Sequence, residues 1–140
     1  MSYQEQSPIR VLLVDDDAAL LRSTQRSLTE HDMEVETASC AAEARVFLKH
    51  FSFDVILCDY SMPGKTGLEF LDEIKSNYPD SIRMILSGKI GGLEIGEKWA
   101  EEIGVSRVFS KPCDIEDIAF EIKKAVEHRE PQGASKLNGA

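Results

Sequence analysis

The chain has 140 residues, of which 42% are hydrophobic, and its formal net charge at pH 7 is -9. This length suits one compact domain, and the excess of acidic residues argues against binding to nucleic acid or to an anionic membrane, since both need clustered lysine and arginine. The three cysteines are odd in number and form no Cys-x-x-Cys pair, so we expect neither a disulfide framework nor a zinc site. Cysteines that form no disulfides also indicate a cytoplasmic location.

Short apolar runs along the chain predict five β-strands. Three runs, at residues 9–14, 55–58 and 82–86, are almost continuously apolar, as in strands that are covered on both faces of a sheet. Residues 33–37 alternate apolar and polar side chains, which is typical of a strand with one face toward water. Residues 105–110 are the fifth candidate.

The segments between these strands have the period of amphipathic helices. Four of them present one apolar face each: Leu20, Leu21, Thr24 and Leu28; Ala44, Phe47, Leu48 and Phe51; Leu68, Leu71, Ile74 and Tyr78; and Ile115, Ile118, Ala119, Ile122 and Val126. Pro79 is expected to end the third of these helices, because the residue before a proline avoids helical geometry. Asp114 is expected to cap the last one.

Another helix and the two ends of the chain are less regular. The helix is expected within residues 91–104, with Trp99 and Ile103 facing inward. Residues 1–8 lack the basic flank and apolar run of a signal peptide and are expected to be an extension, while residues 129–140 have almost no large apolar side chain and are expected to be a disordered tail or a linker. No apolar run approaches the ~18 residues of a membrane span.

Strands that alternate with helices predict an α/β fold, namely a doubly wound parallel sheet with helices on both faces. Right-handed crossovers place the carboxyl ends of all strands at one edge of the sheet, where such sheets bind ligands. Reactive side chains follow four of the predicted strands at this edge: Asp15, Asp16 and Asp17 after the first, Asp59 after the third, Ser87 after the fourth and Lys111 after the fifth.

Crowded carboxylates must either take up protons, with raised pKa values, or share a cation. Mg²⁺ suits this position, because it prefers one or two carboxylates together with water and phosphate oxygens. Mg²⁺ and Lys111 would together supply about three positive charges to balance about three negative ones. A carboxylate beside a metal, a hydroxyl and an ammonium is a setting for forming an aspartyl phosphate, and Asp59 is the natural acceptor.

The motifs of the chain resemble those of the receiver domains of two-component response regulators. LLVDDD, CDYSMPGKTG, ILSG and FSKP come in the order of that family within residues 9–128. The resemblance implies a flavodoxin-like, five-stranded parallel sheet with strand order 2-1-3-4-5. It also implies a signalling domain rather than an enzyme, one that assists only its own phosphorylation and dephosphorylation.

By this resemblance Asp59 would accept a phosphoryl group from a histidine kinase or a phosphotransfer protein, and Ser87 and Lys111 would bind that group. Mg²⁺ would be held by Asp15, Asp16, Asp59 and the backbone carbonyl of Ser61. The Lys111-Pro112 bond is expected to be cis. The face built from the fourth helix, fifth strand and fifth helix would then bind a downstream effector or a second copy of the chain, with no nucleic acid or membrane bound by this chain.

One departure from the family pattern concerns an aromatic residue. Val108 stands where relatives often carry a Tyr or Phe that swings inward on activation. Phe109, one residue later, should face the opposite side of the sheet, because successive side chains of a strand alternate. Whether this chain has an aromatic switch coupled to Ser87 is therefore open.

Two other functions would use some of the same residues. Haloacid-dehalogenase-like phosphatases carry an Asp-x-Asp pair after their first strand, and Asp15 and Asp17 have this spacing, with Asp15 as the nucleophile of a hydrolase. Ala19 in place of the usual small hydroxyl residue argues against this function, as does the CDYSMPG segment, which would have no purpose. A receiver-like binding module that is never phosphorylated is the remaining alternative.

Overall fold

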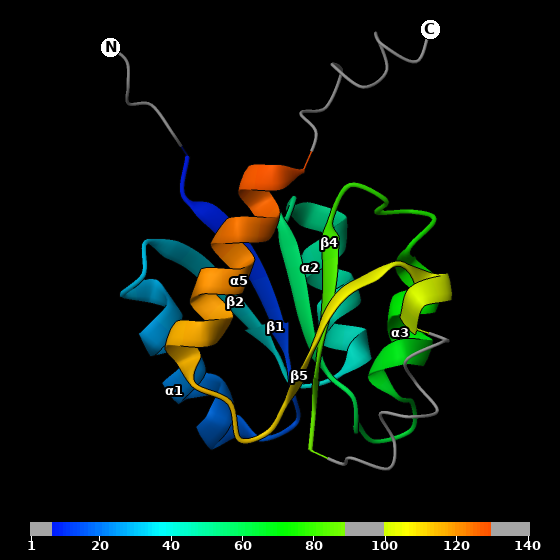
Figure 1. Cartoon of the computed structure of the whole chain (residues 1–140). Coiled ribbons are helices and arrows are strands. Elements are labelled where there is room, and N and C mark those ends of the chain that lie inside the picture. Colours follow the sequence, from blue (N-terminus) through cyan, green and yellow to red (C-terminus); the bar gives the residue numbers. More distant parts are fainter. Residues whose placement is uncertain (1–6, 89–99, 130–140) are drawn as a thin grey trace, which may run out of the picture.

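A parallel sheet of five strands forms the centre of the computed structural model, which describes residues 7–88 and 100–129 (Figure 1). The strands are β1 (Ile9–Val14), β2 (Met33–Ala38), β3 (Val55–Asp59), β4 (Ile82–Ser87) and β5 (Val105–Ser110). They lie in the order β2-β1-β3-β4-β5, and every pairing is parallel. The predicted α/β, flavodoxin-like fold with strand order 2-1-3-4-5 is confirmed.

The strands coincide with the predicted apolar runs or extend them by one residue at the carboxyl end. β1 and β5 have the predicted bounds, whereas β2, β3 and β4 also include Ala38, Asp59 and Ser87 respectively. Asp59 is in register with Leu86 of β4, and Ser87 with Ser110 of β5. Two of the predicted site residues therefore belong to the sheet itself, not to the loops that follow it.

Helices cover both faces of the sheet (Figure 1). They are α1 (Ala18–Thr29), α2 (Ala41–His50), α3 (Gly67–Ile74) and α5 (Ile115–His128), and residues 100–103 are also helical. α1 and α5 contact each other on one face, and α2, α3 and residues 100–103 pack on the other. None of the helices in the described residues is long and apolar enough to cross a membrane.

Each face of the sheet has its own hydrophobic core, because alternate side chains of a strand point to opposite faces. The core under α1 and α5 includes Val11, Leu13, Leu57, Leu86, Phe109 and Ile122. The core under α2 and α3 includes Leu12, Val14, Ile56, Ile85, Leu71 and Ile103. The prediction that Ile103 faces inward is confirmed, whereas Trp99 lies outside the described residues.

Two local predictions about helices are wrong, and a third is confirmed only in part. α3 ends at Ile74 and not near Pro79, because the chain leaves the helix in tight turns in which the Ile74 carbonyl accepts from the backbone N–H groups of Asn77 and Tyr78, at 3.1 and 3.0 Å. Phe51 is 48% exposed, because the chain is already extended there, after the end of α2. Asp114 occupies the N-cap position of α5, as predicted, but its side chain accepts no capping hydrogen bond.

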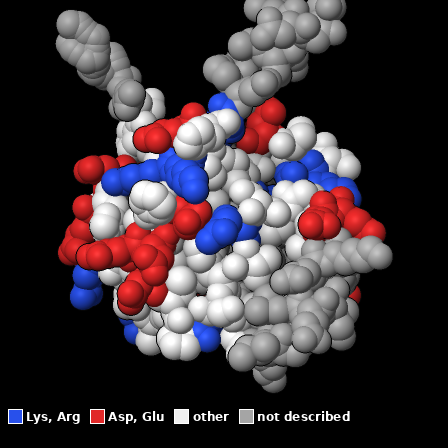
Figure 2. Space-filling model, in the orientation of Figure 1, with Lys and Arg blue, Asp and Glu red and all other residues white. Residues whose placement is uncertain are grey.

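Charge is unevenly distributed over the face that α5 and β5 form. Figure 2 shows acidic side chains gathered around the first turns of α5, where Glu116 and Asp117 lie. Two arginines near this face are paired with acids, Arg107 with Glu121 at 3.3 Å and Arg129 with Asp54 at 2.5 Å.

Candidate functional site

The predicted site residues lie together at the carboxyl edge of the sheet. Asp15 directly follows β1, Asp59 is the last residue of β3, Ser87 is the last residue of β4, and Lys111 directly follows β5. The tips of β3, β4 and β5 are joined by backbone hydrogen bonds, in which Tyr60 donates to the Leu86 carbonyl at 2.7 Å and Lys111 donates to the Ser87 carbonyl at 2.8 Å. The ladder of the sheet thus sets the spacing between these residues.

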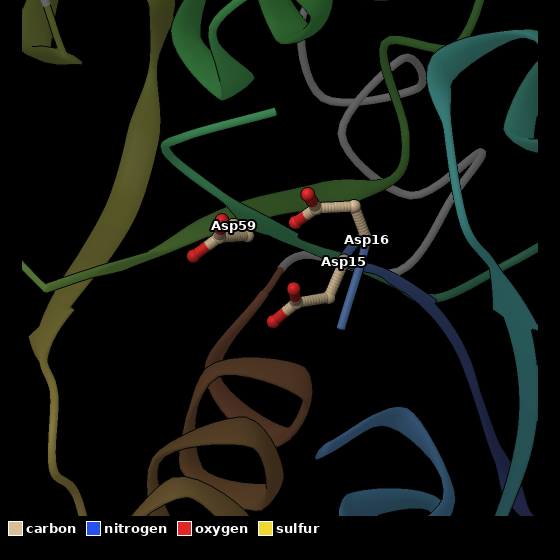
Figure 3. Close-up of side chains that lie close together, drawn as sticks. All are labelled: Asp15, Asp16 and Asp59. Atoms are coloured by element: carbon tan, nitrogen blue, oxygen red, sulfur yellow. The ribbon is translucent and has the colours of Figure 1, made fainter. Parts of the chain in front are cut away.

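Three carboxyl groups meet at this edge. One carboxylate oxygen from each of Asp15, Asp16 and Asp59 lies within 4.8 Å of the other two. Figure 3 shows the three side chains beside a common space, and of these only Asp16 is exposed to solvent. Asp15 and Asp59 are 2% and 5% exposed, so water cannot screen their charges fully.

The Lys111 side chain spans two of these acids. Its Nζ lies 2.7 Å from Asp59 Oδ1 and 3.3 Å from Asp15 Oδ2. Burial lowers the pKa of Lys111, but its hydrogen bond and charge interaction with Asp59, together with its interactions with Asp15, raise the pKa by more, so the net shift is upward. The lysine therefore stays charged and offsets part of the negative charge of the site.

Asp59 keeps an excess of unfavourable interactions despite this lysine. Burial raises the pKa of Asp59, and the nearby negative charges of Asp15 and Asp16 raise it further, whereas Lys111 lowers it. The balance is upward, so one ammonium group does not compensate for the acids. Three carboxylates that can each offer an oxygen, two of them buried, fit a hard divalent cation such as Mg²⁺.

The loop after β1 gives Asp17 a different role from Asp15 and Asp16. Asp15 Oδ1 accepts from the backbone N–H of Asp17 at 3.0 Å, and the backbone N–H of Asp15 donates to the Ala38 carbonyl at 3.0 Å. The Asp17 side chain caps α1 by accepting from the N–H of Leu20 at 3.1 Å. Asp16 is left exposed beside the two buried acids.

The loop after β3 is held tightly against the site by a contact that the sequence analysis missed. Gly67 opens α3, and its N–H donates to the Tyr60 carbonyl at 2.7 Å. A Cβ atom at Gly67 would lie 2.3 Å from the Asp59 carbonyl oxygen, so only glycine allows this approach. The second glycine of the CDYSMPGKTG motif, Gly67, was the available signal. Ser61, the predicted carbonyl ligand, lies in this loop two residues after Asp59.

The same loop is also fixed by side chains. Thr66 and Glu69 form a reciprocal capping box at the start of α3, at 3.1 and 2.8 Å. Lys65 Nζ lies 2.6 Å from Glu73 Oε2, and Glu73 also pairs with Arg45 of α2. These contacts connect the loop after β3 to both α2 and α3.

Ser87, Pro112 and the residues around them are placed largely as predicted. Ser87 is buried at the tip of β4, and the Lys111-Pro112 peptide bond is cis. Phe109 is buried in the core under α1 and α5, while Val108 packs against the core on the opposite face. Phe109 therefore faces away from the position of the family's aromatic residue, as predicted.

The chain belongs to the response regulator receiver domain family, whose model matches residues 11–123. Receiver domains accept a phosphoryl group on an aspartate, bind Mg²⁺ at a cluster of acidic residues, and interact with histidine kinases or phosphotransfer proteins and with effector domains. The phosphatase alternative, with Asp15 as nucleophile, is not supported by this match.

Similar proteins include regulators and isolated receiver domains. The hydrogenase transcriptional regulatory protein HoxA of Cupriavidus necator is 36% identical over 123 residues, which are 88% of this chain and 25% of HoxA. A CheY-like receiver domain protein from Methanospirillum hungatei has a TM-score of 0.80 at 29% identity, covering 86% of this chain and 95% of that structure. A receiver domain protein from Clostridium thermocellum has a TM-score of 0.78 at 30% identity, with 85% and 94% covered. This chain spans only about a quarter of HoxA.

Proposed function

We propose that Asp59 is the phosphoacceptor of this receiver domain and that Ser87 and Lys111 bind the transferred phosphoryl group. The observation that carries this proposal is the position of Lys111 Nζ, which lies 2.7 Å from Asp59 Oδ1 and in reach of Asp15. A charged amine at this distance can bind an oxygen of a phosphoryl group on Asp59. The Ser87 hydroxyl, from the neighbouring strand tip, would bind another.

The proposed metal site consists of Asp15, Asp16, Asp59 and the backbone carbonyl of Ser61. Mg²⁺, when bound, would neutralise charge on the carboxylates and on the phosphoryl oxygens. The three carboxylate oxygens within 4.8 Å of one another support this assignment, as does the raised pKa of Asp59, to which burial contributes most. The acids of this site repel one another and favour a shared cation.

The proposed reaction is a phosphoryl transfer from a phosphohistidine. A carboxylate oxygen of Asp59 attacks phosphorus, the bond between phosphorus and the histidine nitrogen breaks, and the donor histidine keeps the electron pair and takes up a proton. Asp59 must be ionised to attack, and Lys111 favours the ionised form by donating to it. We propose that the chain is a signalling module that assists only its own phosphorylation and dephosphorylation and catalyses no step on another substrate.

The proposed partners are a histidine kinase or phosphotransfer protein as donor and an effector or a second copy of the chain as receiver of the signal. Phosphorylation adds charge and acceptor oxygens beside Ser87 and Lys111, which would shift the segment that follows Ser87, most of which lies outside the described residues. The face that includes β5 and α5 would present this change to the partner. We propose that residues 9–128 form the receiver domain that carries out this signalling. We also propose that it acts in the cytoplasm, where its free cysteines stay reduced.

The test is phosphorylation by acetyl phosphate with Mg²⁺, followed by intact mass and by mapping of the acid-labile group. The natural chain should gain one phosphoryl group, and Asp59→Asn should gain none, while Asp32→Asn, at an exposed acid just before β2 and away from the site, should behave like the natural chain. A phosphoryl group on Asp15 would overturn the assignment of Asp59. No labelling of the natural chain would favour a binding module that is never phosphorylated.

A further inference from the structure

The Arg83 side chain lies near the start of β4, toward the end of the sheet opposite to the acidic site. Its guanidinium is partly buried, and Nη1 donates to the Ser81 carbonyl at 3.2 Å. Its Nε is buried and has no hydrogen-bond partner, and Arg83 forms no ion pair with any acid in the described part of the chain. Among residues 7–88 and 100–129, Arg83 is thus a partly buried cation without a counter-charge.

A groove of about 480 Å³ opens beside this guanidinium. It lies between the start of β4, the start of β5 and the end of α5, and its polar lining comes from Asp80, Ser81, Arg83, Ser106, His128 and Arg129. Gly104 keeps the groove open next to Arg83, because a Cβ atom there would lie 3.1 Å from Arg83 Nη2. Gly104 also has a φ of +84°, which disfavours any side chain at this position.

Arg83 is the arginine of the groove whose positive charge is not balanced by an ion pair within the described residues. Arg129 is already paired with Asp54 at 2.5 Å. Asp80 is the acid among the lining residues, but it is exposed and forms no ion pair within the described residues. A partly buried guanidinium that is paired with no acid is unfavourable, and a bound oxyanion would relieve this by accepting charge-assisted hydrogen bonds from its Nη groups.

We propose that this groove binds a small oxyanion, either a phosphate or a carboxylate group, through Arg83. The Ser106 hydroxyl lines the same groove and can donate a further hydrogen bond. His128 lies at the other side of the groove, where its Nδ1 donates to the Lys124 carbonyl at 2.8 Å, so the ring is held in place by α5. An anion bound here would connect the starts of β4 and β5 at the end of the sheet away from Asp59.

The experiment is a titration of the ¹⁵N-labelled natural chain with inorganic phosphate, and separately with acetate, without Mg²⁺ and at constant ionic strength. Saturable shifts of the backbone amides of residues 81–83 and 104–106 are expected. Saturation by phosphate alone identifies a phosphate site, and saturation by acetate as well identifies a general oxyanion site. No saturable shift at these amides, or shifts confined to the surroundings of Ser87 and Lys111, would overturn the proposal.

Two variants and one control complete the test. Arg83→Gln should weaken binding by about tenfold or more, the usual effect of losing a hydrogen bond to a charged group. Asp80→Asn should tighten it, because this variant keeps Arg83 and removes the exposed acid of the groove. Arg107→Gln, at an arginine already paired with Glu121, should leave affinity unchanged. Equal affinity of Arg83→Gln and the natural chain, or no tightening in Asp80→Asn, would contradict the assignment.

Discussion

Gly67 opens α3 against the backbone of Asp59, so replacing it with alanine tests how the acceptor residue is positioned. The added Cβ atom would lie 2.3 Å from the Asp59 carbonyl oxygen and 3.1 Å from Ile85 Cδ1. Non-bonded heavy atoms prefer a separation of roughly 3.5 Å, so the backbone around Asp59 and the start of α3 must move apart by about 1 Å. No flexible side chain at Asp59 can absorb this movement, because the atom involved belongs to the backbone.

The expected loss of stability follows from two opposing effects. Overpacking of this kind costs up to about 3 kcal/mol, and alanine in a helix regains ~1 kcal/mol relative to glycine. The net loss is about 2 kcal/mol, which in a domain of this size lowers Tm by about 6–10 °C. A shift of the acceptor by about 1 Å is also expected to slow its phosphorylation by about 100-fold.

Thermal unfolding and the rate of labelling by acetyl phosphate measure these two effects. Gly88→Ala is the matched control for stability, because a Cβ atom there would meet its nearest neighbour, Lys111 Cδ, at an ordinary 3.9 Å. An unchanged Tm for Gly67→Ala, equal to that of Gly88→Ala, would show that the contact with Asp59 is not restrictive. An unchanged labelling rate would show that the approach of α3 does not position the acceptor.

Three further measurements address the site and the core. Burial raises the pKa of Asp59, so the protonated Asp59 side chain stabilises the fold fully below the ordinary pKa of aspartate, and this stabilisation is lost as pH rises through the raised pKa. Without Mg²⁺, Asp59→Asn should therefore unfold at a higher urea concentration than the natural chain at pH 7. This difference should shrink toward pH 4. At a Mg²⁺ concentration of 100 times the Kd of the natural chain, Mg²⁺ should stabilise the natural chain by about 2.7 kcal/mol. At the same concentration it should stabilise Asp16→Asn less. Urea titrations with and without EDTA would measure both effects. Burial raises the pKa of the Cys58 thiol, so a disulfide reagent at pH 8 should modify Cys40 and Cys113 in the folded chain and reach Cys58 only after denaturation; rapid reaction of Cys58 in the folded chain would contradict its burial.

The sheet and the edge that carries the site were predictable because their signals are local in sequence. Buried parallel strands appear as continuous apolar runs, and the first polar residue after each run marks the edge of the sheet. Strand ends and right-handed crossovers were therefore enough to place Asp15 and Asp59 at one edge.

The details that the sequence did not reveal depend on contacts between distant segments. The tight packing of Gly67 on Asp59 is set by how α3 meets the tip of β3, and no local pattern encodes that distance. Phe51 has the spacing of a core residue but lies beyond the end of α2, where its ring is 5.4 Å from the guanidinium carbon of Arg10. Arg83 looks like an ordinary surface residue until its burial and the lack of an acid paired with it in the described part of the chain are seen together.

The hydrogen bonds that join the tips of β3, β4 and β5 have a consequence for how this domain can diversify. Because the separation of Asp59 and Lys111 is set by adjacent strands and not by the segments beyond them, those outer segments can accept substitutions and insertions while the chemistry is retained. Evolution or protein engineering can therefore change the recognition of partners without rebuilding the reactive edge.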